Sequence, residues 1–563
     1  MKKVLFLLSF IIFWPFSSQA AEFAKQIYFN GDILTMNDKQ PQVEALAIKD
    51  GKILAVGSKD EVFKLKDSKT QLVDLKGKTL LPGFIDPHSH FINAVEMADW
   101  VNISAPPVGS VNSIADLLSV LDQYKKSKNP KSGDWIVGYG YDATTLSDGR
   151  ELTRDDLDKV FPNNPVVLIH VSLHGAVLNS AAFKAVGIDA NTPTPVGGII
   201  LRKPGTGEPA GLLMEQAFLP VYLKLPKPSE AQMLAGLKTA QNIYASHGYT
   251  TAVDAPLEGP SIELYQKGAD QNLFYIDLIG FARWLEFPDM IQKGFKPTQE
   301  YHNHYRWPAG VKIVGDGSPQ GKTAFFTKPY LTGGPSGEKN WLGNPNITQD
   351  DLNKLIKLAY DNHVQVEYHA NGDAAIDMLL KAHQLAGAPT DRRTTAIHSQ
   401  FIRPDQLDQY VKLGIIPSFF TNHAFFWGDV HVKNLGKQRA YFLSPMKTAK
   451  AKGLHMTNHS DAAVTPPYPL FTVWSAVNRV SRSGQVIGPD ERISPMDALK
   501  AITLDAAYQY FEENKKGSLE PGKFADLVIL AANPTKIDSM KIKDIQVLET
   551  VKEGKTVYQK VAH

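Results

Sequence analysis

The chain of 563 residues contains no cysteine. This absence excludes disulfide bonds, catalysis by a thiolate and zinc sites built from cysteine, so a metal site would have to use histidine, carboxylates or lysine. An excess of one charge is also missing, because without Lys2 and Lys3 the chain has 58 basic and 58 acidic residues. Nucleic acid and anionic membranes are therefore not expected as partners, since both require a basic excess.

Long apolar runs are missing beyond the first 20 residues. Lys2 and Lys3 precede the apolar run Val4–Phe16, and the small-residue cleavage signature Ser18-Gln19-Ala20 follows it. A helix of this length spans about 20 Å, less than the roughly 30 Å of membrane hydrocarbon. We therefore expect residues 1–20 to be a signal peptide cleaved near Ala20, with a retained anchor as the alternative. The mature protein is expected to be exported, periplasmic or secreted, without stable membrane insertion.

Both ends of the mature chain share one pattern. Residues 22–80 and 517–563 contain short alternating strands punctuated by turns. Two such pieces flanking a large central part, 81–516, predict one small β-sandwich built from both terminal segments.

The central part is predicted to be an α/β domain, a (β/α)₈ TIM barrel, because eight apolar runs alternate with helical periodicity. The interval after the first run has about 160 residues, too many for a structureless loop. Residues of about 91–235 are therefore predicted to form an inserted subdomain. The eight runs are Gly83–Asp86, Thr250–Asp254, Tyr275–Phe281, Val311–Asp316, Val364–His369, Thr394–His398, Gly414–Phe419 and Leu454–Asp461.

The first run leads into His88 and His90. In a strand these two side chains point to the same side, so they can share a metal ion. A second pair with this spacing, His302 and His304, has no apolar strand before it and is assigned to the surface. Barrel active sites lie at the C-terminal ends of the strands, so partners of His88 and His90 are expected at later strand ends.

Four later strands supply such partners. Lys312 lies in the fourth run, His369 and His398 end the fifth and sixth, and Asp461 ends the eighth. Each has an ordinary explanation when taken singly: a satisfied core histidine, an aspartate capping the next helix, or Lys312 paired with Asp316. Their joint occurrence in barrel order favours a metal site.

This order of residues resembles the amidohydrolase superfamily, and finer motifs resemble its amidohydrolase family 3 branch, the N-substituted formamide deformylase-like metal-dependent hydrolases. The resemblance extends over nearly the whole mature chain. Two departures concern substrate contacts: Ser-Pro-Gln-Gly-Lys-Thr-Ala follows Asp316-Gly317 and carries Lys322, and the sixth strand reads Ala-Ile-His398. The motifs are Leu81–His90, His174 with Asn179-Ser180, Gly207–Gly211 with Glu215, Val311–Gly317, His369–Asp373 and Gly517–Asp526.

The resemblance implies a set of metal ligands and a mechanism. His88 and His90 would hold one divalent ion, expected to be zinc, together with Asp461, and His369 and His398 would hold a second. Lys312, carboxylated by CO₂, would bridge the two, since an unmodified ammonium would repel both ions. A metal-activated hydroxide would attack a carbonyl while Asp461 acts as base and then as acid. A site with one ion and unmodified Lys312 is the alternative.

A second group of residues is predicted to bind substrate or support the site. His174 and Glu215 of the insertion, Lys322, and His423 beside an aromatic cluster are the substrate-binding candidates. His455 and His459 are predicted to be supporting residues, with His459 holding Asp461.

The sequence thus predicts an exported metal-dependent amidohydrolase that cleaves a C–N bond, of amide type, in a small organic molecule. Esters, lactones or cyclic imides are alternative substrates for the same site. A non-catalytic binding or regulatory protein on the same scaffold is the alternative from another class, and it predicts missing ligands. A homodimer is the default expectation for a barrel of this size.

Overall fold

The computed structural model describes residues 23–561 except for 107, 172–174, 196–197 and 335–337. The predicted signal peptide and its cleavage site near Ala20 lie outside the described residues. Among the helices in the described ranges, none is both long and apolar enough to cross a membrane.

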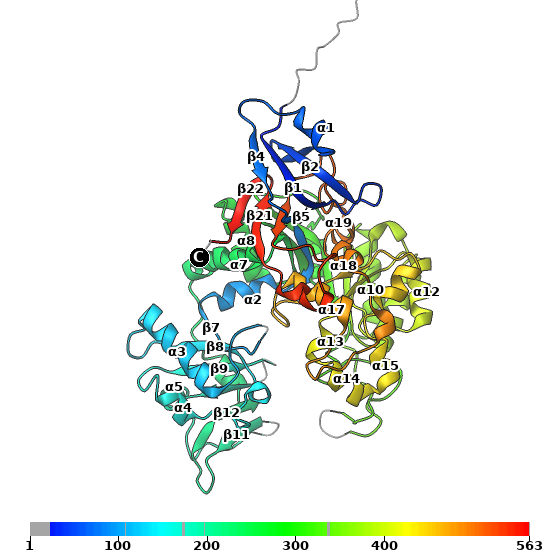
Figure 1. Cartoon of the computed structure of the whole chain (residues 1–563). Helices are drawn as coiled ribbons and strands as arrows, with labels where there is room; N and C mark the ends of the chain where they lie inside the picture. The colour runs from blue at the N-terminus through cyan, green and yellow to red at the C-terminus, as the bar shows by residue number, and fades with distance from the viewer. Residues whose placement is uncertain (1–22, 107, 172–174, 196–197, 335–337, 562–563) are drawn as a thin grey trace, which may run out of the picture.

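Strands from both ends of the chain form one eight-stranded sheet, in which the first strands (blue) lie beside the last (red) in Figure 1. Strand β1 pairs with β4 through residues 26–29 and with β5 at Asp32 and Ile33. The sheet divides there, and its two halves share a core that includes Leu46, Leu80 and Leu527. The strands are β1 (Gln26–Leu34), β2 (Gln42–Lys49), β3 (Lys52–Gly57), β4 (Gln71–Asp74), β5 (Thr79–Pro82), β20 (Leu527–Leu530), β21 (Val547–Lys552) and β22 (Lys555–Gln559).

Eight parallel strands form the central sheet in chain order, so the predicted (β/α)₈ barrel is confirmed. The last strand meets the first through the backbone: the His90 N–H donates to the carbonyl of Ala462, and the Asp461 N–H donates to that of His88. The eight are β6 (Phe84–Ser89), β13 (Tyr249–Leu257), β14 (Asp277–Arg283), β15 (Tyr305–Val314), β16 (Gln365–Ala370), β17 (Thr395–His398), β18 (Ile416–Phe419) and β19 (Thr457–Asn458).

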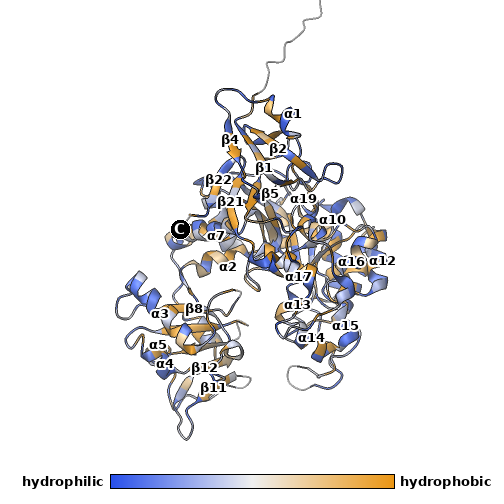
Figure 2. Ribbon diagram, in the orientation of Figure 1, coloured by the Kyte–Doolittle hydropathy of each residue, from blue (hydrophilic) through white to orange (hydrophobic). Residues whose placement is uncertain are grey.

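Amphipathic helices cover the barrel. In α10 (Gln349–Asp361), Thr348 caps the first turn by accepting the Asp351 N–H, and Leu352, Leu355, Ile356 and Ala359 face the core at helical spacing. Figure 2 shows hydrophobic colour in the central strands and mixed colour on the outer helices. The other principal helices are α2 (Phe91–Glu96), α7 (Glu230–Ser246), α8 (Gly259–Asp270), α9 (Phe287–Gln292), α11 (Asp373–Leu385), α12 (Pro404–Leu413), α13 (His423–Phe426), α14 (Gly428–Leu435), α15 (Lys437–Tyr441), α16 (Met446–Ala451), α17 (Pro469–Asn478), α18 (Pro495–Ala501) and α19 (Leu504–Gln509).

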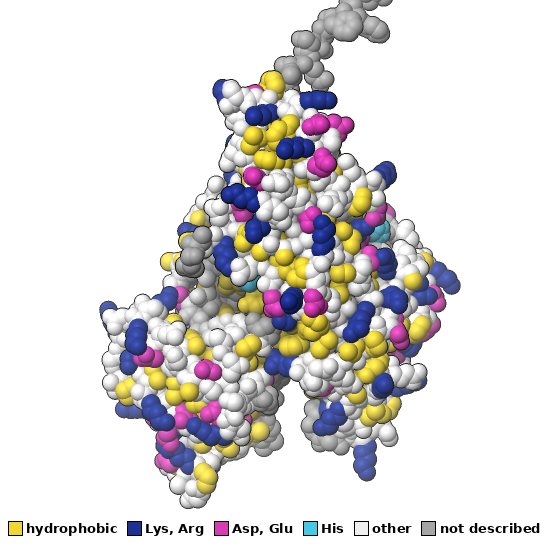
Figure 3. Space-filling model, in the orientation of Figure 1, with side chains coloured by type: hydrophobic (Ala, Val, Ile, Leu, Met, Phe, Trp, Pro, Cys, Tyr) yellow, Lys and Arg dark blue, Asp and Glu magenta, His cyan; other side chains and the backbone are white. Residues whose placement is uncertain are grey.

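The insertion forms a separate lobe around a six-stranded sheet (Figure 1). Phe91 and Val95 of α2 still pack in the barrel core, so this lobe's own sheet begins later than residue 91. Figure 3 shows the surface hollowed between this lobe and the one that carries α13–α15, with charges of both signs mixed on this face. The lobe contains β7 (Val101–Asn102), α3 (Ile114–Lys128), β8 (Ile136–Tyr141), α4 (Arg154–Asp158), β9 (Val166–His170), β10 (Gly175–Leu178), α5 (Ser180–Val186), β11 (Gly198–Arg202), β12 (Pro209–Glu215) and α6 (Leu219–Tyr222).

A buried ionic cluster joins the base of the barrel to the terminal sheet. Asp277, at the start of β14, accepts hydrogen bonds from Lys516 and, at 2.9 Å, from Lys552, and it lies 2.8 Å from His304. Burial opposes ionisation of Asp277, but the two lysines hold its pKa well below the usual value. His302 is exposed as predicted, whereas His304 is half-buried in this cluster because Asp277 supplies a partner.

Replacing Asp277 with Asn is expected to destabilise the protein by about 3–5 kcal/mol, because two buried ammonium groups lose the carboxylate they share and keep only Glu512 and Asp526 as counter-charges. The loss would be measured as a lower urea midpoint at pH 7. Since the pKa of Asp277 is depressed on folding, its contribution exists above the unfolded value of about 3.9 and disappears as the pH falls below it. The difference in stability between the wild type and D277N should therefore become smaller below about pH 4.

The matched control is Asp270→Asn, which removes an exposed partner of His302. An exposed pair contributes about 0–1 kcal/mol, so this variant should unfold near the wild-type midpoint. Equal destabilisation by both substitutions would contradict the role assigned to the buried cluster.

Candidate metal centre

A cavity of about 200 Å³ opens at the C-terminal ends of the barrel strands. It contains all six predicted metal ligands, together with apolar residues and the Ser318–Gln320 turn. The structure therefore brings together side chains that are far apart in sequence. The lining residues are His88, His90, Pro256, Lys312, Val314, Ser318, Pro319, Gln320, His369, Asn371, His398, His423, Asp461 and Val464.

One corner of the cavity is formed by His88, His90 and Asp461. The Oδ1 atom of Asp461 lies 3.4 Å from Nε2 of His88 and 3.4 Å from Nε2 of His90. This oxygen is buried and has no hydrogen-bond partner among the described residues. Two atoms bound to one tetrahedral zinc ion lie about 3.3 Å apart, so the spacing fits ligands that converge on one ion.

A second corner is formed by His369 and His398. Nε2 of His398 lies 3.1 Å from Nδ1 of His369, and the two rings are nearly perpendicular, at 81°. The distance between these two nitrogens is again suited to two ligands of one ion.

Lys312 lies between the two corners. It is 1% exposed, its Nζ lies 3.0 Å from Nε2 of His88, and burial lowers its pKa to about 8. Glu367, which the sequence reading missed, lies beneath it: Oε1 accepts from the Tyr510 hydroxyl, and Oε2 lies 3.7 Å from Nδ1 of His88. The signal was strand alternation, because Glu367 precedes His369 by two residues and shares its face.

The backbone at two of these positions is unusual. His398 and Asp461 adopt φ values of +72° and +53°, a region that L-residues rarely occupy. Non-glycine residues in this region carry strain and concentrate at functional sites. The geometry turns both side chains toward the cavity at the point where their strands end.

Asp316 holds the loops around His369. Its carboxylate accepts hydrogen bonds from the backbone N–H groups of Asn371, Gly372 and Phe325. A Cβ at Gly372 would collide with the carbonyl oxygen of Phe325, so only glycine fits there. The Lys312–Asp316 ion pair considered from the sequence is absent from the described contacts, because Asp316 is committed to these backbone groups.

The protonation states suit a cation. Burial, followed by the nearby Lys312, holds the pKa of His88 well below its usual value, and burial and His369 do the same for His398. Burial would raise the pKa of Asp461, but contact with His90 lowers it to about 2. Neutral imidazoles and an ionised carboxylate are the forms that bind divalent metals. Ligand atoms of His88, His398 and Asp461 lie within 4.8 Å of one another, so the residues fit a metal ion.

A buried hydrogen-bond chain orients His398. The Gln509 amide N–H donates to the carbonyl of Pro87, so its oxygen accepts the only hydroxyl proton of Thr457, at 2.7 Å. The Thr457 hydroxyl also contacts that of Ser418, at 2.8 Å.

The same chain continues through His459. The Ser418 hydroxyl lies 3.0 Å from Nδ1 of His459, and Nε2 of His459 lies 3.0 Å from Nδ1 of His398. When Nε2 of His398 binds a metal, its Nδ1 carries the proton, and Nε2 of His459 is the acceptor for it. The prediction that His459 supports Asp461 is corrected: His459 holds His398. His455 is on the surface, paired with Asp505.

The substrate-binding candidates differ in placement. His423 lines the cavity, whereas Lys322 does not. His174 lies outside the described residues, and for Glu215 only the backbone, in β12, is described. Pro256 and Val464 line the cavity without a sequence motif that would have marked them, whereas Gln320 belongs to the stretch after Asp316-Gly317 that the sequence connects with substrate contacts.

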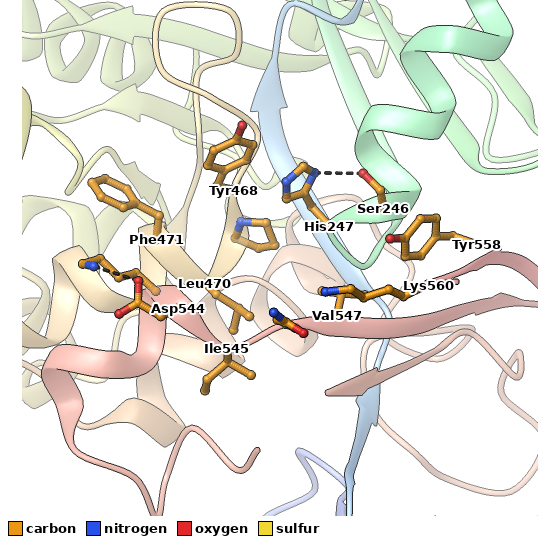
Figure 4. Close-up of a pocket in the computed structure, with 13 residues that line it drawn as sticks. Ser246, His247, Tyr468, Leu470, Phe471, Asp544, Ile545, Val547, Tyr558 and Lys560 are labelled. Carbon is orange, nitrogen blue, oxygen red and sulfur yellow. Dashed lines mark hydrogen bonds and ion pairs between the residues drawn. The ribbon is translucent and has the colours of Figure 1, made fainter. Parts of the chain in front are cut away.

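A larger cavity, of about 410 Å³, lies away from these residues at the junction of α7, α17, β21 and β22 (Figure 4). His247 and Tyr468 stack there with centroids 4.3 Å apart. Of its lining side chains one is a histidine, and the carboxylate of Asp544 is paired with Lys543 at 2.8 Å. The smaller cavity is therefore the candidate active site.

Fold and site together define a (β/α)₈ barrel with a candidate metal site, and the comparisons with known proteins agree. A family model described as Amidohydrolase family matches residues 71–558, so the chain belongs to this family and the resemblance read from its motifs is confirmed. Among its relatives is N-substituted formamide deformylase of Arthrobacter pascens, 27% identical over 542 residues, covering 94% of this chain and 98% of that protein.

Two further matches extend over almost the whole chain. Protein LONG AFTER FAR-RED 3 of Arabidopsis thaliana is 30% identical, covering 94% of this chain and 91% of that protein. A crystal structure of an uncharacterised metal-dependent hydrolase from Pyrococcus furiosus has a TM-score of 0.71 at 22% identity, covering 91% of this chain and 100% of that one. The latter shows a shared fold.

Replacing His88 or His398 with Asn is expected to remove most of the bound divalent metal, because each change removes a converging ligand. Metal per chain would be measured by mass spectrometry after dialysis. His302→Asn, in the exposed pair with the same spacing, should keep the wild-type content. Full metal content in both site variants would contradict the assignment.

His459→Leu is expected to weaken metal binding about 10–100-fold, because His398 loses the acceptor that fixes its tautomer. Affinity would be measured by competition with a chelator of known strength. His455→Leu, on the same segment but at the surface, serves as the control and should bind metal as the wild type does.

Proposed function

We propose that the protein is a metal-dependent amidohydrolase that cleaves the C–N bond of a small amide, with zinc as its metal. The observation that carries the proposal is the convergence of His88, His90, Lys312, His369, His398 and Asp461 on one cavity. A divalent ion bound there would lower the pKa of a water molecule and polarise a carbonyl group. The remaining chemistry belongs to the side chains.

Asp461 is the residue placed to move protons. It is ionised at neutral pH, buried, and has one oxygen free of hydrogen bonds among the described residues. It can accept a proton from the attacking water and return it to the nitrogen of the leaving amine. A poor leaving group such as an amine needs this protonation.

The arrangement supports two ions more than one. His88, His90 and Asp461 would hold the first, and His369 and His398 the second. Lys312, in contact with His88, would be carboxylated, since a buried ammonium beside two cations would repel them. The compact set His88, His398 and Asp461 supports the alternative of a single ion. Metal analysis distinguishes the two alternatives: two ions per chain would support the two-ion site, and one ion per chain would support the single-ion site.

A small substrate fits the cavity, which is below the range of about 300–1,000 Å³ that drug-sized ligands occupy. N-formyl and short N-acyl amines are the first candidates, and a formamide deformylase is among the relatives. Esters, lactones and cyclic imides remain the competing class. A non-catalytic protein would be expected to lack ligands, and all six are present. Because the sequence predicts a signal peptide, we place the reaction outside the cytoplasm.

Purified protein is expected to release amines from N-formyl or N-acyl compounds, and Asp461→Asn should lower kcat by about 10²–10⁴-fold, because general acid–base help is lost. Amine release would be followed with a fluorogenic amine reagent. Asp505→Asn, which affects a surface ion pair, is the control. Turnover of esters but of no amide, or full activity in D461N, would contradict the proposal.

A further inference from the structure

A pair of buried histidines forms part of the cavity wall. His423, at the start of α13, lines the cavity, and its Nδ1 lies 3.0 Å from Nε2 of His431 in α14. The two rings are stacked, with an angle of 7° between them. Phe420 and Trp427 each pack against His423 at 4.6 Å between ring centroids. The orientation of the His423 ring is therefore fixed, and its remaining nitrogen, Nε2, has no hydrogen-bond partner among the described residues and is available to the cavity that His423 lines.

The direction of the hydrogen bond between the two rings determines what Nε2 of His423 presents. Both rings are neutral, because burial lowers their pKa values, to about 3 for His431. If His423 donated through Nδ1, the proton of His431 would sit on its own Nδ1. That atom is buried and has no partner among the described residues.

The opposite direction of the hydrogen bond between His423 and His431 costs less free energy. Nε2–H of His431 then donates to Nδ1 of His423, and the unpartnered atom of His431 is an acceptor. Orphaned buried N–H donors are rarer in proteins than orphaned acceptors. A free neutral imidazole side chain also prefers its proton on Nε2, which both rings have in this arrangement. His423 consequently presents an N–H group to the cavity.

The rest of the cavity lining is complementary. Besides Oδ1 of Asp461, which is assigned to the metal, two buried oxygens of the lining residues have no hydrogen-bond partner within the described part of the chain: Oδ1 of Asn371 and Oε1 of Gln320. An amide that keeps an N–H has a donor for these oxygens and a carbonyl acceptor for His423. An ester or a tertiary amide lacks the donor.

We propose that His431 positions His423 as a hydrogen-bond donor to the carbonyl oxygen of the substrate, and that the substrate is a primary or secondary amide. The inference rests on the proposed function and adds the recognition of its substrate. As the carbonyl is attacked, negative charge gathers on this oxygen, so a fixed neutral donor there stabilises the transition state more than the ground state. The oxygen-rich side of the cavity receives the amide N–H.

The first test is independent of turnover. Nitrogen-15 NMR of protein labelled at histidine, with signals assigned by their loss in the His423→Gln and His431→Gln variants, should show both neutral rings protonated at Nε2. Protonation at Nδ1 in either ring would overturn the inference. Metal content is measured in every variant.

The second test uses matched substitutions. His423→Leu should lower kcat about 10²–10³-fold without loss of metal, whereas His423→Gln, which keeps an N–H at a similar reach, should stay within about tenfold of wild type. His431→Leu should give an intermediate loss and a mixture of His423 tautomers. Val430→Ala, an exposed position on the same helix as His431, is the control for α14.

Pairs of substrates distinguish a failure of this inference from a failure of the proposed function. A secondary amide should be hydrolysed at least about tenfold faster than its N-methylated tertiary counterpart, as expected when one hydrogen bond of about 1.4 kcal/mol is lost. Hydrolysis of amides with no discrimination, or wild-type kcat in His423→Leu, would overturn this inference alone. If no amide is hydrolysed by the metal-loaded wild type, the proposed function itself fails.

Discussion

The closure of the barrel between its first and last strands is the constraint on which the rest of the site depends. His88 and His90 come from β6, and Asp461 follows β19, at opposite ends of the barrel sequence. Backbone hydrogen bonds from Asp461 to His88 and from His90 to Ala462 place their side chains at ligand spacing. Asp86, buried and bonded to Ser460, reinforces the same seam. The site exists because the barrel closes there.

Burial without polar partners gives these side chains their chemistry. A buried ionisable group that lacks hydrogen bonds is costly, so proteins keep few of them. Here such groups occur together, including Oδ1 of Asp461 and Oε2 of Glu367. The free energy for this arrangement comes from packing elsewhere, as in the large apolar core between the strands and the covering helices. A bound cation would give the unpartnered oxygen of Asp461 the interaction it lacks.

The sequence was sufficient for the barrel and the positions of the six candidate ligands, because strand periodicity and strand ends are local signals. Contacts between loops could not be predicted from the sequence. Nothing in the sequence near Asp316 indicates that its carboxylate would bind three backbone N–H groups instead of Lys312. The role of His459 was misjudged for the same reason: its nearness to Asp461 in sequence suggested a partner, whereas its ring reaches past β18 to His398 at the end of β17.

Two histidines of the cavity show how the residues behind a ring decide what it offers in front. Nδ1 of His398 lies 3.0 Å from Nε2 of His459, which accepts its proton when the lone pair of His398 Nε2 binds a metal. His423 is backed by a donor, His431, so it presents an N–H group. The same side chain thus serves as a metal ligand at one position and as a donor to substrate oxygen at another. Side chains that touch neither metal nor substrate control this difference.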